Sequence, residues 1–205
     1  MAQRLSPQPR QPKGLNAGHL RIWALLCLTL GTLGVSVFQN AILNLPNISG
    51  EALLAAMEAD PKVMGYATAA LLLQAICCCA VPLFAFLLTE GFEKSRSRTH
   101  YFLRVLGVAA VSELPYNLAT SGKWLDTATR NPAFGLVLAM LMLYFFRHFG
   151  QKSLAHFAIK AVVAVAAVLW ALMLRIDQGA PLVVLTLTLW LCRRKPTLRT
   201  VFGCV

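Results

Sequence analysis

The chain has 205 residues, of which 58% are hydrophobic and only 13% are charged. Water-soluble domains carry about 25% charged residues, so this composition excludes an ordinary soluble fold and indicates a surface that largely faces lipid. The formal net charge of +11 would suggest nucleic acid for a soluble protein, but no basic run alternates with aromatic residues that could stack on bases. We therefore expect an all-α, polytopic transmembrane helical bundle that has the lipid bilayer as its partner and binds no nucleic acid.

The six cysteines do not have the paired spacing of a zinc site or of a secreted disulfide framework. Cys77, Cys78 and Cys79 follow one another and would point in three directions around a helix, so they cannot chelate one ion. We interpret the cysteines as small packing residues and expect no metal site.

Residues 1–19 (MAQRLSPQPRQPKGLNAGH) are basic, rich in proline and glutamine, and without hydrophobic periodicity. They predict a disordered cytoplasmic tail rather than a signal peptide, because no small-residue cleavage site closes the apolar run that follows. That run, residues 22–45, carries no charge and is longer than the about 20 residues that cross a bilayer. We predict a transmembrane domain over residues 20–195 and a short cytoplasmic tail over 196–205. The five later spans are expected at residues 63–89, 101–120, 131–146, 155–174 and 179–192.

Between the first two spans, Ser49, Gly50 and Glu51 precede a short amphipathic stretch, residues 52–59. A serine cap followed by an acidic first turn favours a helix start. Pro61 is expected to end this helix.

The distribution of lysine and arginine predicts the orientation. Fifteen lie in the two tails and in the second and fourth connections, whereas four lie in the alternate connections. This asymmetry predicts six spans with both ends in the cytoplasm, because cytoplasmic loops are enriched in basic residues. The inner group is Arg4, Arg10, Lys13, Arg21, Lys94, Arg96, Arg98, Arg104, Arg147, Lys152, Lys160, Arg193, Arg194, Lys195 and Arg199, and the outer group is Lys62, Lys123, Arg130 and Arg175.

Glu113 is the only acidic residue well inside a predicted span. It lies nine residues beyond Arg104, about 13 Å along a helix, and a carboxylate at that depth must face protein or a watery cavity. Tyr116 and Asn117 share its helix face, and Pro115 frees a backbone carbonyl and favours a kink. The three side chains therefore either line a cavity or only hold helices together.

Other groups are predicted at a similar depth. Pro82 frees the carbonyl of Cys78 in the second span, while Gly31 and Thr32 lie about 15 Å from the cytoplasmic end of the first span. These residues line one cavity with Glu113 if their helices are neighbours. Asp177 lies in a tight outer turn, where it is expected to pair with Arg175. His19, His100, His148 and His156 fall at cytoplasmic ends of spans, where solvated interfacial residues are expected.

The chain has the motifs PLFAFLLTEGF at residues 82–92, YFLR at 101–104, SELPYNLA at 112–119, Asn131 at the start of the next span, and DQG at 177–179. Together, these motifs resemble the TraX family. TraX proteins are bacterial inner-membrane proteins named for the enzyme that acetylates the amino terminus of conjugative pilin. They are similar to a broader class of integral-membrane acyltransferases that use acyl-CoA.

The chain departs from the family pattern at four places. An Asp-His pair is usual in the first span, where this chain has Gly31 and Thr32, and an arginine is usual at the position of Cys78. An aspartate is usual at Asn117, and a tyrosine at Gln178. An Asp-oriented histidine is a typical general base, so the obvious base of the family is missing here.

The resemblance implies acyl transfer, for example of an acetyl group, from acyl-CoA to an amino or hydroxyl acceptor, with no bound cofactor. Glu113 is the candidate catalytic residue, and Arg96, Arg98 and Arg104 are candidates for attracting the coenzyme phosphates. The usual enrichment of basic residues in cytoplasmic loops explains these arginines equally well. The alternative is a catalytically degenerate homologue that binds a lipid or a partner protein, whereas a transporter would need more polar residues along a path. The expected substrate cavity is lined by Gly31, Thr32, Cys78, Tyr116, Asn117 and Asn131.

Overall fold

The computed structural model describes residues 17–126, 128–149 and 153–194. Residues 1–16 of the predicted amino-terminal tail and the whole predicted carboxyl-terminal tail, residues 196–205, lie outside the described part. The first helix, α1 (Ala17–Leu33), begins within the last three residues assigned to the amino-terminal tail.

α1 continues directly into η1 (Gly34–Ile42), a π-helix. Its wider turn is visible at the end, where the N–H of Leu43 donates to the carbonyl of Phe38 at 2.9 Å. After the short 3₁₀ turn η2 (Leu45–Asn47), the helix α2 (Gly50–Ala59) begins. The hydroxyl of Ser49 accepts from the N–H of Ala52 at 3.3 Å, which confirms the predicted serine cap.

The second long segment consists of α3 (Pro61–Cys78) and α4 (Ala80–Lys94). Pro61 follows the end of α2 and also starts α3, where a missing N–H costs nothing. The Asp60 carboxylate caps this start by accepting from the N–H of Lys62 at 2.8 Å. The helix is interrupted at Cys79, close to the Cys78 carbonyl that Pro82 cannot bind.

The rest of the chain is also helical. α5 runs through Pro115 to Ser121 and ends at Gly122, whose φ of 68° gives the left-handed conformation typical of helix ends. The predicted spans agree with the helices to within three residues, except that α1 begins five residues before the first predicted span and α4 ends five residues after the second. The remaining elements are α5 (Arg98–Ser121), α6 (Ala133–His148), α7 (Leu154–Met173), α8 (Gly179–Leu191) and η3 (Cys192–Arg194).

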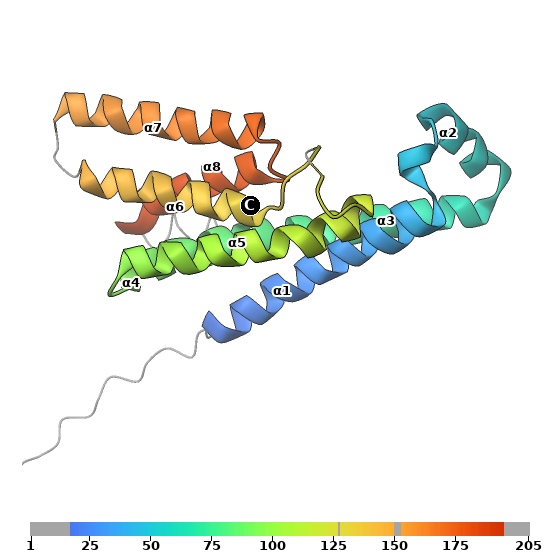
Figure 1. Ribbon diagram of the computed structural model, residues 1–205, viewed down its shortest axis with the longest axis horizontal. Helices are drawn as coiled ribbons and strands as arrows, with labels where there is room; N and C mark the ends of the chain where they lie inside the picture. The colour runs from blue at the N-terminus through green and yellow to red at the C-terminus, as the bar shows by residue number, and fades with distance from the viewer. Residues whose placement is uncertain (1–16, 127, 150–152, 195–205) are drawn as a thin grey trace, which may run out of the picture.

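The long helices run roughly along the longest axis of the molecule, and α2 lies at one end beside α3 (Figure 1). Neighbours in space are often distant in sequence, because α4 contacts α1, α6 and α8. The described residues form no β-strand, only an isolated bridge between Arg130 and Ile176. The all-α prediction is therefore confirmed for the described part of the chain.

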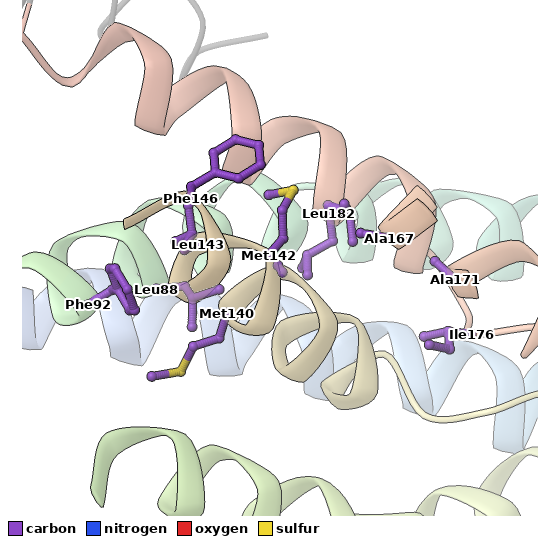
Figure 2. Packing of buried hydrophobic residues seen from close by; sticks show 12 residues of the cluster. Leu88, Phe92, Met140, Met142, Leu143, Phe146, Ala167, Ala171, Ile176 and Leu182 are labelled. Atoms are coloured by element: carbon purple, nitrogen blue, oxygen red, sulfur yellow. The ribbon is translucent and has the colours of Figure 1, made fainter. Parts of the chain in front are cut away.

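The buried core lies between α4, α6, α7 and α8 (Figure 2). Leu88 and Phe92 of α4 meet Met140 and Leu143 of α6, and Val183 of α8 is fully buried against them. This packing fixes the half of the bundle that includes the start of α5 and the end of α6.

The outer faces of the helices are apolar. Leu71, Val111 and Phe157 are 67%, 74% and 72% exposed, which is typical of side chains that face lipid. Three helical segments, Gly18–Ile42, Pro61–Lys94 and Leu154–Met173, are long and apolar enough to cross a membrane. These segments support a membrane protein, whereas six crossings and the side of each terminus stay predictions.

Candidate functional site

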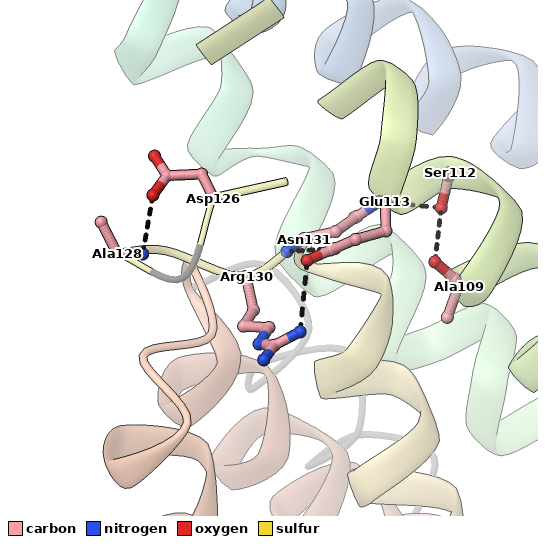
Figure 3. Close-up of polar contacts among 7 residues, drawn as sticks. All are labelled: Ala109, Ser112, Glu113, Asp126, Ala128, Arg130 and Asn131. Carbon is pink, nitrogen blue, oxygen red and sulfur yellow. Dashed lines mark hydrogen bonds and ion pairs between the residues drawn. The ribbon is translucent and has the colours of Figure 1, made fainter. Parts of the chain in front are cut away.

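Glu113 is buried, with 8% of its surface exposed, and its carboxylate faces the segment that precedes α6 (Figure 3). Oε2 accepts from the backbone N–H of Asn131 at 3.1 Å. Oε1 lies 3.7 Å from Nη1 of Arg130, which is an ion pair but too long for a hydrogen bond. Oε1 is buried and has no hydrogen-bond partner among the described residues.

Asn131 ties this carboxylate to two helices. Its Nδ2 donates to the hydroxyl of Ser112 at 2.7 Å, and its Oδ1 accepts from the N–H of Ala133 at 2.9 Å. The second bond satisfies one of the unpaired N–H groups at the start of α6. Because Asn131 is itself only 7% exposed, its position fixes where Glu113 meets α6.

The turn between α7 and α8 completes the site. Arg130 donates its N–H to the carbonyl of Arg175 and accepts at its own carbonyl from the N–H of Asp177, both at 2.9 Å. The hydroxyl of Tyr116 donates to Oδ2 of Asp177 at 3.3 Å. We call this group of side chains the polar junction; it comprises Ser112, Glu113, Tyr116, Arg130, Asn131 and Asp177.

Glycines allow α6 and α8 to start close together beside the polar junction. A Cβ on Gly135 would lie 3.1 Å from Cα of Gly179, and a Cβ on Gly179 would lie 2.7 Å from Cβ of Ile176. Gln178, just before α8, has a φ of 51°. A left-handed residue other than glycine is strained, and such strain is concentrated at functional sites.

Asp177 lies outside the apolar helices, in this turn. Burial raises the pKa of its carboxyl above the ordinary value, and hydrogen bonds from Tyr116 and from the N–H of Gln178 offset part of that rise. The expected ion pair with Arg175 is not formed within the described part of the chain. That expectation was wrong because the backbone of the turn leaves Arg175 exposed and brings Asp177 to Tyr116.

The other expected cavity residues are placed differently. Nε2 of Gln178 donates to Sγ of Cys78 at 3.9 Å, so Cys78 adjoins the polar junction. Gly31 lies at the contact between α1 and α3, where a Cβ would be 2.3 Å from Cβ of Cys77. The hydroxyl of Thr32 donates within its own helix to the carbonyl of Thr29 at 2.9 Å.

Asn117 lies on α5 one turn beyond Glu113 and is 1% exposed. Neither Oδ1 nor Nδ2 of its amide has a hydrogen-bond partner among the described residues. Leaving a buried polar group unpaired costs about 1–3 kcal/mol. Asn117 is therefore a candidate for contact with a bound molecule beside the polar junction.

The three arginines expected to attract coenzyme phosphates lie toward the opposite end of α5. Fifteen residues separate Arg98 from Glu113, about 22 Å along the helix. Arg98 lines a cavity of about 390 Å³ between the start of α5 and the end of α6, whereas Arg96 and Arg104 are exposed. The structure thus separates the expected donor-binding end from Glu113.

A model of the TraX protein family matches residues 18–203, which is nearly the whole chain. The chain belongs to the TraX family. No curated protein and no solved structure matches it. Residues 112–119, which carry part of the TraX resemblance, include three members of the polar junction. One of the family motifs therefore lies at this site.

In this TraX protein, Glu113 is a group of the polar junction that is suited to proton transfer. Oε2 of Glu113 is bound by a backbone N–H, while Oε1 is free of hydrogen bonds to described residues and lies beside a cation. Such a carboxylate is able to accept a proton from a hydroxyl or an amine that approaches Oε1. Arg130 supplies a positive charge at the same place.

Sequence reasoning missed Arg130, Ser112 and the contact between Tyr116 and Asp177. Arg130 carried a weak signal, because it is one of only four basic residues assigned to the outer side and directly precedes Asn131. Nothing in the local sequence indicates that the loop before α6 reaches Glu113.

Proposed function

We propose that this TraX protein transfers an acyl group, such as acetyl, from acyl-CoA to an amino or hydroxyl acceptor at the polar junction. Membership of the family and the chemistry of Glu113 support the proposal. The observation that carries it is the buried Oε1 atom, which has no hydrogen-bond partner among the described residues and lies 3.7 Å from Arg130. Glu113 is the proposed general base.

The proposed step needs no further reactant. Oε1 of Glu113 takes the proton from the acceptor O–H or N–H, and the acceptor oxygen or nitrogen forms a bond to the thioester carbonyl carbon. The carbon–sulfur bond breaks, and the coenzyme leaves as a thiolate that takes the proton from Glu113. Arg130 is the proposed group that stabilises the oxyanion developing on the carbonyl oxygen, because its guanidinium lies 3.7 Å from Oε1 of Glu113.

The proposal includes a location and an orientation. The chain crosses the bacterial inner membrane six times with both ends in the cytoplasm, as the fifteen-to-four distribution of basic residues supports. Arg96, Arg98 and Arg104 then face the cytoplasmic donor, and the polar junction lies toward the outer side. The thioester of the donor must therefore reach about 22 Å along α5.

The test uses inverted membrane vesicles supplied with acetyl-CoA labelled in the acetyl group. We expect label in a membrane acceptor with the parent chain, and a loss of about 10²- to 10⁴-fold with Glu113→Gln, the usual contribution of a general base. Glu51→Gln is the matched control, because Glu51 lies exposed on α2 and should leave labelling unchanged. Unchanged melting in detergent shows that Glu113→Gln still folds.

A second candidate is a degenerate homologue that binds a lipid or a partner protein without turnover. The packing of Gly31 against Cys77 favours this second candidate. The aspartate of the family Asp-His pair belongs at position 31, and the contact with Cys77 leaves no room for its side chain. Labelling that is the same with and without the chain would overturn acyl transfer and leave this candidate.

A further inference from the structure

A second polar site lies at the far end of α5 from Glu113. The cavity of about 390 Å³ is bounded by the first residues of α5 and the last turns of α6. Two guanidinium groups and an imidazole face it together with three hydroxyl groups, and no carboxylate lines it. The lining residues are Ser97, Arg98, Thr99, Tyr144, Arg147 and His148.

Arg98 is held in place by the core. Its guanidinium carbon lies 5.5 Å from the centre of the Phe92 ring, and Phe92 is only 1% exposed. Its Nε is buried and has no hydrogen-bond partner among the described residues. A cation–π contact holds a guanidinium in place without using its N–H donors. Arg98 therefore has an N–H group beside the cavity that makes no hydrogen bond to the described residues.

The start of α5 adds to the positive potential of the cavity. The hydroxyl of Ser97 accepts from the N–H of His100 at 3.5 Å, while the N–H groups of the first turn point out of the helix without helical partners. α5 has 24 residues, and the amino terminus of a helix attracts anions. This effect reinforces the two arginines, which carry the full charges.

We propose that this cavity binds the phosphate ester group of a ligand. Arginine forks match phosphate oxygens in a bidentate way. Arg98 and Arg147 together carry enough positive charge for the two negative charges of a phosphate monoester or the single charge of a phosphodiester. The source is either the headgroup of an anionic phospholipid or a water-soluble phosphate ester such as coenzyme A. A lipid is able to reach the site because Tyr144 is 51% exposed and the neighbouring Phe145 is 41% exposed. The inference stands without acyl transfer, because it requires binding only.

The test measures binding of two probes to the purified full chain. Phosphatidylglycerol in nanodiscs, with phosphatidylcholine of the same acyl chains as reference, reports the lipid source, and free coenzyme A reports the soluble source. Arg98→Gln with Arg147→Gln should lower the affinity for at least one probe about tenfold or more, as expected for the loss of charged hydrogen bonds. The probe whose affinity falls identifies the source of the phosphate group.

The matched control is Lys62→Gln with Lys123→Gln, which removes the same charge from exposed positions outside the cavity and should change either affinity by less than about threefold. Arg147→Gln alone is the second variant, because Arg147 is exposed and its loss leaves Arg98 packed on Phe92. The inference is wrong if both probes bind the cavity variants as well as they bind the control variant. Because free coenzyme A carries no acyl group, this result is independent of transfer.

Discussion

Gly31 lies where α1 packs against α3, and a Cβ there would be 2.3 Å from Cβ and 2.5 Å from Sγ of Cys77. Gly31→Ala should therefore lower the free energy of unfolding in detergent. Overpacking costs about 1–3 kcal/mol, which exceeds the about 1 kcal/mol that alanine gains over glycine in a helix. Thermal and denaturant unfolding of the purified protein measure this difference.

Gly65→Ala is the control, because a Cβ at Gly65 of α3 meets nothing within 4 Å, and it should leave stability unchanged or raise it. Cys77→Gly should restore part of the stability lost by Gly31→Ala, since it removes both clashing atoms. Equal stability of Gly31→Ala and the parent would show that the two helices are not in this contact. The same clash means that an aspartate at position 31 requires a smaller residue at 77.

Glu113 illustrates how far single residues were predictable. Its depth followed from counting residues along a helix, and its shared face with Tyr116 and Asn117 followed from helical periodicity. Its partners Arg130 and Asn131 did not follow, because they approach through the loop before α6. Gly31 and Thr32 had a plausible depth, but depth does not determine which neighbour a residue faces.

Among the elements, η1 makes a contact that joins the first helical segment to α5. Nδ2 of Asn40 donates to the carbonyls of Thr120 at 2.6 Å and Ala119 at 3.3 Å, and the hydroxyl of Ser36 donates to the same Ala119 carbonyl at 2.9 Å. Carbonyls in the last turn of a helix have no helical partner. Bonds from η1 therefore complete the end of α5.

Asn40→Leu should destabilise the protein by about 1–3 kcal/mol, the cost of leaving a part-buried carbonyl unpaired. Gln39→Leu is the matched control on the same helix, because Gln39 makes no hydrogen bond through its side chain within the described residues. The measurement is denaturant unfolding in detergent. A loss that is the same for the two variants would mean that the bonds to α5 contribute nothing specific.

The helices themselves were largely predictable. Apolar runs located the long helices, and the chemistry of Ser49 indicated the cap of α2. Pro82 was expected to free the carbonyl of Cys78, and the interruption at Cys79 lies beside that carbonyl. The π-helical form of η1 was not predicted, because hydropathy does not distinguish one helical winding from another. The length of α4 at its carboxyl end was also underestimated, since polar residues there continue the helix beyond the apolar run.

For the whole molecule, composition indicated a membrane protein and the motifs indicated the TraX family, which the family match confirms. The arrangement of the helices could not be predicted from composition or motifs. α4 packs on α8 and α1 packs on α4, and such contacts depend on side-chain shape across distant segments. The polar junction follows from this arrangement, since it joins α5 to the starts of α6 and α8.

The proposed acyl transfer depends on the orientation of the bundle. Donor binding at the Arg98 end requires that this end faces the cytoplasm and that the loop after α5 faces the outside. Single cysteines in a chain without the six native cysteines test this directly. Ser97 and Lys123 are suitable positions, because both are exposed and lie at opposite ends of α5.

The decisive measurement is labelling with a membrane-impermeant thiol reagent in intact cells and in permeabilised cells. Lys123→Cys should react in intact cells, and Ser97→Cys should react only after permeabilisation. The positive-inside distribution of fifteen basic residues against four predicts this result. Reaction of Ser97→Cys in intact cells, with Lys123→Cys protected, would contradict the orientation and with it the assignment of the donor end.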